Sequence, residues 1–151
     1  MRLRNKGTTL LELTLTVGLL SVVMAMALPA FSSYTHHARA NRAIGEISRI
    51  SMEIYRWRAN HGDGSYPVSL AKAGIAAEHD PWGNAYAYLR IADAPRSAIR
   101  TDRQRRSLNT DFDLYSLGPD GRTAAALDAE TAADDIVRAG DGAYVGVAAQ
   151  F

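Results

Sequence analysis

One acidic residue at the start of a long uncharged stretch constrains this chain more than any other feature. Residues 13–38 contain no Asp, Glu, Lys or Arg, and Glu12 stands directly before them. As an α-helix, residues 10–31 would extend roughly 30 Å, which is enough to cross a bilayer. A carboxylate close to lipid costs roughly 3 kcal/mol unless a cation pairs with it. Glu12 is therefore a candidate functional residue, and its expected partner is a positive charge at the same depth.

The residues before the apolar stretch indicate where that charge could come from. Arg2, Arg4 and Lys6 form a short basic leader that ends at Gly7. In a secretory signal peptide the small-residue cleavage site follows the apolar region, whereas here the glycine precedes it. Cleavage after Gly7 would leave the apolar segment on the protein as an anchor, and the new amine of Thr8 would be the missing cation. The alternative is a plain signal anchor in which the glutamate is incidental.

Composition agrees with one exported domain on this anchor. About 115 residues follow the apolar segment, a normal size for a single core. The net charge of +1 gives no electrostatic case for binding nucleic acid. Because the chain has no cysteine, an exported domain must be stabilised by packing or by a metal. The basic leader would stay in the cytoplasm and the rest would lie on the far side of the membrane.

The pattern after the anchor predicts a helix followed by a small antiparallel sheet. Between residues 34 and 60 apolar side chains recur every three or four positions, at Ile44, Ile47, Ile50, Ile54 and Trp57. Residues 86–91, 111–117 and 144–148 are predicted strands, the first two forming a hairpin. Residues 80–83 fit a type I turn. The expected fold class is α+β, a long helix packed on a small antiparallel sheet.

The N-terminal motif resembles that of a known family. Lys6-Gly7-Thr8-Thr9-Leu10-Leu11-Glu12 is similar to the cleavage and N-methylation motif of type IV pilins and type II secretion pseudopilins, and Pro29 stands where such pilins carry a helix-kinking proline. The resemblance implies that a prepilin peptidase cuts between Gly7 and Thr8 and methylates the new amine, and that Glu12 and Pro29 serve assembly. It divides the chain into a prepilin leader at 1–7, a transmembrane and filament-core helix at 8–31, and a periplasmic globular domain at 32–151. A bend or local melting of the helix is expected at Pro29.

Two motifs in the second half narrow the resemblance to the major pseudopilin of type II secretion. They are Asp-Pro-Trp-Gly-Asn at 80–84 and Phe-Asp-Leu-Tyr-Ser-Leu-Gly-Pro-Asp-Gly at 112–121. In that family a calcium ion holds the loop that follows, and the matching ligands here are the Leu117 carbonyl, Asp120, Asp134 and Asp135. Calcium takes six to eight oxygen ligands, which carboxylates and carbonyls on a turn can supply. The alternatives are an exposed acidic loop, or a short helix through the alanine-rich residues 124–133 capped by Asp128.

A basic loop and the histidines complete the candidate features. The loop 94–110 carries Arg96, Arg100, Arg103, Arg105 and Arg106. Its favoured interpretation is a solvated loop, because charge runs on loops are usually solvated, and the alternative is a contact with an acidic neighbour. The four histidines form no metalloprotease or other catalytic motif and there is no cysteine nucleophile, so the chain is not expected to be an enzyme.

The resemblance implies a structural subunit of a type II secretion pseudopilus in the bacterial inner membrane, polymerised in the periplasm to drive protein export. Its expected partners are other copies in a homopolymer filament, the prepilin peptidase, minor pseudopilins, the inner-membrane assembly platform and membrane lipid. Two alternatives stay open: a type IV pilus subunit, and a membrane-anchored periplasmic binding module that never polymerises. The absence of a cysteine pair near the C-terminus favours the pseudopilin over the pilin.

Overall fold

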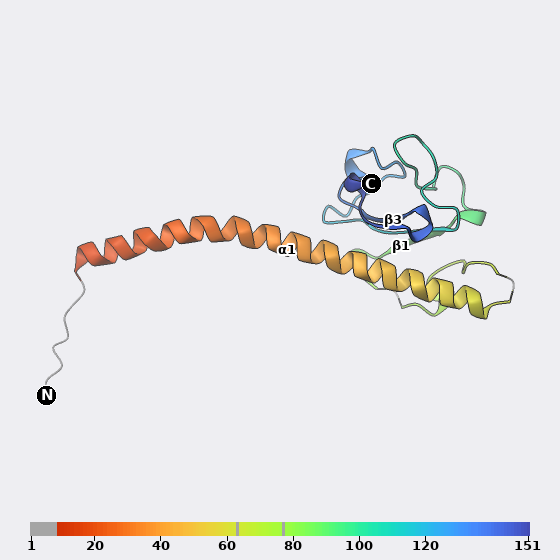
Figure 1. Ribbon diagram of the computed structural model, residues 1–151, viewed down its shortest axis with the longest axis horizontal. Coiled ribbons are helices and arrows are strands. Elements are labelled where there is room, and N and C mark those ends of the chain that lie inside the picture. The colour runs from red at the N-terminus through yellow and green to blue at the C-terminus, as the bar shows by residue number, and fades with distance from the viewer. Residues whose placement is uncertain (1–8, 63, 77) are drawn as a thin grey trace, which may run out of the picture. The chain divides into compact units, whose positions relative to one another are not determined.

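The computed structural model describes residues 9–62, 64–76 and 78–151 and shows one long helix followed by a four-stranded sheet (Figure 1). The sheet has the order β1-β2-β3-β4, and every neighbouring pair is antiparallel. The elements are α1 (Leu10–Asn60), β1 (Ala87–Arg90), β2 (Phe112–Ser116), β3 (Ile136–Ala139) and β4 (Tyr144–Val147), with single 3-10 turns between them. The predicted α+β class is confirmed.

The chain forms two compact units, Met1–His37 and Ala38–Phe151. The described part of the first unit is the beginning of α1 with Thr9 before it. The second unit holds the rest of the helix and the sheet. The sequence places the corresponding boundary at 31–32, where the apolar stretch becomes more polar. Packing begins later, since the first fully buried residue of α1 is Ala43.

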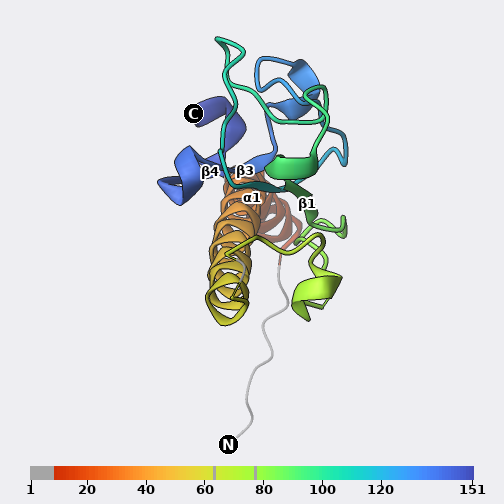
Figure 2. The ribbon, with the colours of Figure 1, turned by 90° about the vertical axis from the view of Figure 1, so that its right-hand side faces the viewer.

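The core of the second unit lies between the C-terminal part of α1 and the sheet (Figure 2). Ile47, Ile50 and Ile54 are at most 1% exposed and belong to one apolar cluster with Phe112 of β2 and Ile136 of β3. Burial of one such side chain stabilises the fold by about 2 kcal/mol. The predicted stripe is therefore confirmed over these isoleucines.

Trp57 does not belong to that core, although the sequence pattern includes it in the stripe. Its ring stacks on His61 at a centroid distance of 3.7 Å. The periodic pattern records only that an apolar side chain recurs at a helical spacing, whereas the exposed last turn of the helix offers Trp57 a local aromatic partner instead of the sheet.

The hairpin of β1 and β2 is confirmed, with Ala87 opposite Tyr115 and Arg90 opposite Phe112. The last predicted strand corresponds to β4. β3 is not among the predicted strands, because its four residues do not alternate between polar and apolar. All four are buried, including Arg138, since β3 is an inner strand with neighbours on both sides.

Pro29 lies inside α1, and the helix continues without interruption from Leu10 to Asn60. Of the two expected effects, local melting does not occur at this position, and a bend stays a prediction. A proline removes the hydrogen bond to the carbonyl four residues earlier, which is that of Ala25. The bonds of the turns on either side are sufficient to keep the helical path.

Candidate functional site

Glu12 lies in the first turn of α1, where the structure gives it a local helix-capping context. The backbone N–H of Glu12 donates to Thr9 Oγ1 at 3.2 Å, and the N–H of Leu13 donates to the Thr9 carbonyl at 3.1 Å. Thr9 is thus the N-cap and Glu12 the third helical residue, a position where a negative charge is favoured by the helix dipole. Gly7 and Thr8, the predicted cleavage site, lie outside the described residues.

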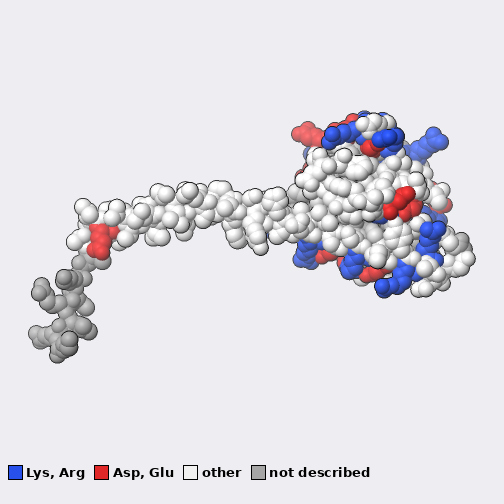
Figure 3. Space-filling view, in the orientation of Figure 1, with Lys and Arg blue, Asp and Glu red and all other residues white. Residues whose placement is uncertain are grey.

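The side chains that follow Glu12 form an exposed apolar surface. The most apolar 18-residue window of the helix has a mean hydropathy of 2.0, and none of it is buried. Leu19, Leu20 and Val22 are each more than 60% exposed. Figure 3 shows this stretch almost without charge, in contrast to the second unit. By length and composition the helix can cross a membrane, and its apolar side chains have no cover within the described chain.

The hydroxyl groups of this apolar segment are satisfied by the helix itself. Thr14 and Thr16 donate to the carbonyls of Leu11 and Leu13 at 2.9 and 2.8 Å, and Ser21 donates to that of Val17 at 2.8 Å. A polar group in hydrocarbon must find its partner internally. These hydroxyls therefore impose little cost in lipid, and Glu12 remains the one charged side chain of residues 10–38.

The two motifs of the second half pack against each other. Asp80 is 4% exposed, and its Oδ1 accepts the N–H groups of Trp82 and Asn84 at 3.0 and 2.8 Å. Its Oδ2 accepts the hydroxyl of Ser116 at 2.5 Å, while the Asn84 side chain donates to the Gly118 carbonyl at 2.9 Å. The predicted turn at 80–83 is confirmed by the bond from Gly83 N to the Asp80 carbonyl at 2.9 Å.

The predicted calcium ligands divide between two environments. Asp120 is exposed, and its Oδ1 accepts the N–H of Arg122 at 2.7 Å. Asp134 is half-buried, and its Oδ2 accepts the N–H of Asp120 at 3.2 Å. Leu117, which directly precedes the turn at Gly118, is half-buried. Gly118 has a φ of +63°, and a Cβ at that position would lie 2.5 Å from the Asp134 carbonyl oxygen, so the turn requires glycine there.

Asp135 is in the second environment. It is fully buried, and its Oδ2 lies 2.6 Å from Nη2 of Arg100, itself only 2% exposed. Burial raises the pKa of the Asp135 carboxyl, while the hydroxyl of Thr123 and the charge of Arg100 oppose that rise. Among the residues that the structure describes, no group of three or more His, Cys, Asp or Glu is arranged to hold a metal. The side chains at this loop are therefore not arranged as the set of calcium ligands that the sequence predicts. Calcium at this loop stays a prediction.

The alternative of a short helix through residues 124–133 is only partly realised. A single 3-10 turn, η3 (Glu130–Ala132), forms there, and its N-cap is Ala129 without a side-chain bond. The expected cap, Asp128, pairs instead with Arg105 at 3.1 Å. An ion pair with the basic loop thus replaces the predicted capping role.

A second buried arginine joins the helix to the sheet, and it is not among the candidate residues predicted from the sequence. Arg138 of β3 lies 2.7 Å from Asp111 Oδ2 and also donates to the Tyr55 hydroxyl of α1. Its guanidinium carbon lies 4.0 Å from the centroid of the Phe112 ring. The sequence signal was an arginine within the apolar run 136–139, which is unusual unless the charge is paired.

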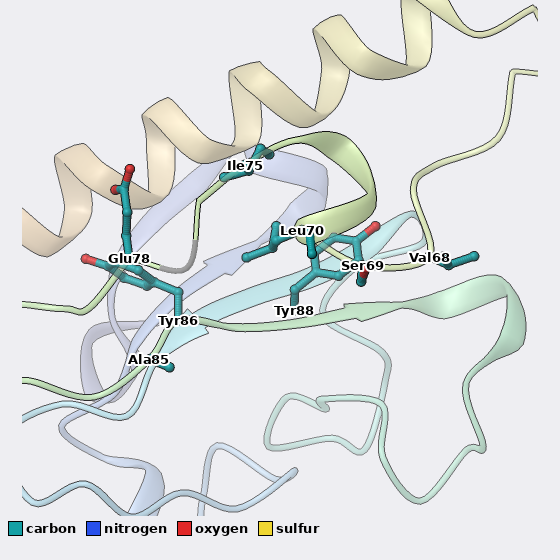
Figure 4. A pocket seen from close by; sticks show the side chains of 9 residues that line it. Val68, Ser69, Leu70, Ile75, Glu78, Ala85, Tyr86 and Tyr88 are labelled. Atoms are coloured by element: carbon teal, nitrogen blue, oxygen red, sulfur yellow. The ribbon is translucent and has the colours of Figure 1, made fainter.

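A pocket of about 290 Å³ lies beside β1 (Figure 4). The Tyr86 hydroxyl donates to Glu46 Oε2 at 2.6 Å, the Tyr88 hydroxyl donates to the Pro67 carbonyl at 2.7 Å, and Glu78 pairs with Arg49. Burial raises the pKa of both phenols. The titratable groups of the lining are therefore engaged in structure and are poor candidates for catalysis. The lining residues are Val68, Ser69, Leu70, Ala71, Ile75, Glu78, Ala85, Tyr86 and Tyr88.

Comparison with known proteins finds relatives of two kinds. A fimbrial protein of Neisseria meningitidis serogroup A is 25% identical over 74% of this chain and 63% of its own length. The type IV major pilin protein PilE1 of Neisseria gonorrhoeae is 31% identical over 51% of this chain and 46% of its own. The type II secretion system core protein G of Pseudomonas aeruginosa is 26% identical over 80% of this chain and 88% of its own.

The matches with the two neisserial proteins thus span less than two thirds of those proteins. No family model matches the chain, and no solved structure matches it. The sequence matches agree with the fold, in which one apolar helix continues into a domain with a four-stranded antiparallel sheet. The chain is therefore similar to type IV pilins and fimbrial proteins and to a type II secretion system core protein G, and its fold is a pilin-like arrangement of one long helix and an antiparallel sheet.

Proposed function

We propose that this chain is a structural subunit of a type II secretion pseudopilus. The observation that carries the proposal is the match with protein G, which extends over 88% of that protein, whereas the pilin matches stop at 63% and 46%. The coarser role of a pilin-type subunit agrees with all of these relatives. A structural role also agrees with a pocket whose titratable groups are already hydrogen-bonded or ion-paired.

In this proposal the prepilin peptidase cleaves after Gly7 and methylates the amine of Thr8. The subunit waits in the inner membrane with its globular domain in the periplasm. On assembly the exposed apolar side chains of α1 exchange lipid for neighbouring helices, which is favourable through packing and not through the hydrophobic effect. Glu12 pairs with the Thr8 amine of the next subunit. Minor pseudopilins and the inner-membrane platform would start and drive the polymer.

The Glu12 pair selects the register between subunits more than it adds stability. Transfer of two charges out of water costs about as much as their attraction returns, but one partner left alone is strongly unfavourable. Subunits shifted along the helix would bury an unpaired carboxylate. The capping bond from the Glu12 N–H to Thr9 is a backbone contact, so it leaves the carboxylate available for an intermolecular partner.

The test combines processing with assembly. Mass spectrometry of the membrane-extracted protein should show a chain beginning at Thr8 and one methyl group heavier. Glu12→Val should still be cleaved and inserted, since it removes a charge from an apolar segment, yet should lose filaments and secretion. Ser21→Ala, a change in the same helix that removes only a self-satisfied hydroxyl, is the matched control and should assemble normally.

Four results would test the proposal and separate its alternatives. An intact leader in cells that contain the peptidase would contradict the processing step. Normal filaments from Glu12→Val would exclude the pairing mechanism. Filaments on the surface of wild-type cells, together with unimpaired secretion in a strain that lacks the gene, would favour the type IV pilus subunit, which the neisserial matches support. A processed protein that never polymerises would favour the binding module.

A further inference from the structure

The basic loop 94–110 contains one arginine that differs from the rest. Arg96, Arg103, Arg105 and Arg106 are exposed, as the interpretation of a solvated loop predicts. Arg100 is 2% exposed, so that interpretation is wrong for this residue. A charged side chain is rarely buried to this extent unless a partner neutralises it. The neighbours of Arg100 therefore indicate what the loop does.

The guanidinium of Arg100 lies among groups of the acidic loop 118–135. Its Nη2 donates to Asp135 Oδ2 at 2.6 Å and its Nη1 to Thr123 Oγ1 at 2.7 Å. The Thr123 hydroxyl in turn donates to Asp135 Oδ2 at 2.5 Å. The guanidinium carbon lies 4.1 Å from the centroid of the Tyr115 ring on β2. One buried cation thus contacts the acidic loop at two separate points, Thr123 and its last residue Asp135, and also contacts β2 through Tyr115.

Backbone hydrogen bonds follow the same path. Thr101 N donates to the Ala125 carbonyl at 2.8 Å, and Leu127 N donates to the Thr101 carbonyl at 3.0 Å. The N–H of Arg100 donates to the buried carboxylate of Asp113 at 2.9 Å. The basic loop therefore joins the middle of the acidic loop as a short parallel bridge and is itself held to β2. Because these groups are buried, any conformation of the loops that breaks one of these hydrogen bonds leaves an unsatisfied polar group and is costly.

We infer that Arg100 is an internal cation that holds the acidic loop 118–135 in place, so that the order of this loop does not depend on a divalent metal. Asp135 is one of the three carboxylates that the family resemblance assigns to calcium, and here the guanidinium of Arg100 already neutralises it. A calcium ion next to the same oxygen would meet a positive charge and would lack the six to eight oxygens it prefers. The inference does not depend on whether the subunit belongs to a pseudopilus or a pilus.

The pair is not fully satisfied, which sharpens the expected mutational pattern. Arg100 Nε and Asp135 Oδ1 are buried and have no hydrogen-bond partner among the residues that the structure describes. Such a pair adds little compared with apolar residues of similar size, but loss of one member leaves a bare buried charge. Single replacements should therefore be damaging, whereas the joint replacement Arg100→Met with Asp135→Leu should restore most of what each one loses.

The test uses the full chain in detergent micelles, with thermal unfolding and amide hydrogen exchange measured in millimolar calcium, in chelator and in sodium chloride of matched ionic strength. The wild type should give the same melting temperature in all three. Arg100→Met should lower it by roughly 10 °C and speed exchange at Leu127 at least about tenfold. Arg96→Met, an exposed change in the same loop, should alter neither.

Three outcomes would overturn the inference. The first is a rise in the wild-type melting temperature with calcium but not with sodium, abolished by Asp120→Ala. The second is unchanged Leu127 exchange in Arg100→Met. If Arg100→Met does not fold, the joint variant and the three-buffer comparison still decide. Recovery of the fold by the joint variant supports the inference, and failure to recover it, the third outcome, contradicts the inference.

Discussion

The two parts of α1 have the same secondary structure and opposite surroundings. From Leu10 to His37 the described side chains are almost all exposed, while from Ala43 to Ile54 one face is buried against the sheet. Both parts are apolar at helical spacing, yet only the second finds its partners within the chain. A helix without internal packing must obtain specificity from outside, and the charged Glu12 is the residue of the first part best suited to supply it.

The largest expected difference between the two parts concerns truncation of an apolar side chain. Ile50→Ala should lower the free energy of unfolding of the second unit by about 3 kcal/mol, because it opens a cavity beside Phe112. Leu20 is 62% exposed, so Leu20→Ala should leave that free energy of unfolding unchanged. Urea unfolding of both variants in micelles measures it, and equal losses would show that the first part also packs within the chain.

A smaller effect concerns the phenol that links α1 to β1. Burial and the neighbouring Glu46 raise the pKa of Tyr86, so its stabilising contribution is present below the ordinary tyrosine pKa of about 10 and is lost as the pH rises above it. Stability should therefore fall between about pH 9.5 and 11, by up to about 1.4 kcal/mol per pH unit for this one group.

Tyr86→Phe tests that assignment. The variant should lose about 1 kcal/mol at pH 7 with the hydrogen bond to Glu46, and its alkaline decline should be shallower than that of the wild type. Tyr34→Phe is the control, since Tyr34 is 72% exposed. Parallel alkaline slopes for wild type and Tyr86→Phe, measured by urea unfolding at a series of pH values, would show that folding does not raise the pKa of Tyr86.

The smallest expected effect compares two serines on the same helix. Ser51 Oγ is buried and has no hydrogen-bond partner in the described part of the chain, while Ser21 Oγ is bonded to the Val17 carbonyl. Ser51→Ala should raise the free energy of unfolding by up to about 1 kcal/mol, because it removes an unsatisfied hydroxyl. Ser21→Ala should leave it within about 0.5 kcal/mol of the wild type. Destabilisation by Ser51→Ala would indicate a partner for that hydroxyl in solution.

The elements that could be predicted are those whose signal is local. The isoleucine spacing identifies the buried face of α1, and the alternation in residues 86–91 and 111–117 identifies β1 and β2. β3 is missed because its four residues do not alternate between polar and apolar, and because Arg138 within it conceals that all four are buried. Trp57 is misplaced because periodicity does not say where the covering sheet ends. The Asp128 cap is wrong because a distant arginine competes for its carboxylate.

The sequence by itself determined the apolar helix with its single acid, the helical stripe, the hairpin of β1 and β2 and the absence of disulfides, since each depends on composition or on neighbours along the chain. Only the tertiary structure decided which charges are buried. Arg100 and Asp135 are 35 residues apart, and nothing in their local sequence distinguishes them from solvated charges. Arg138 and Asp111 are 27 residues apart, and the apolar neighbours of Arg138 indicate a buried charge without identifying its partner. Desolvation and pairing are properties of the folded arrangement, because the cost of burying a charge and the partner that offsets it arise together when distant segments meet.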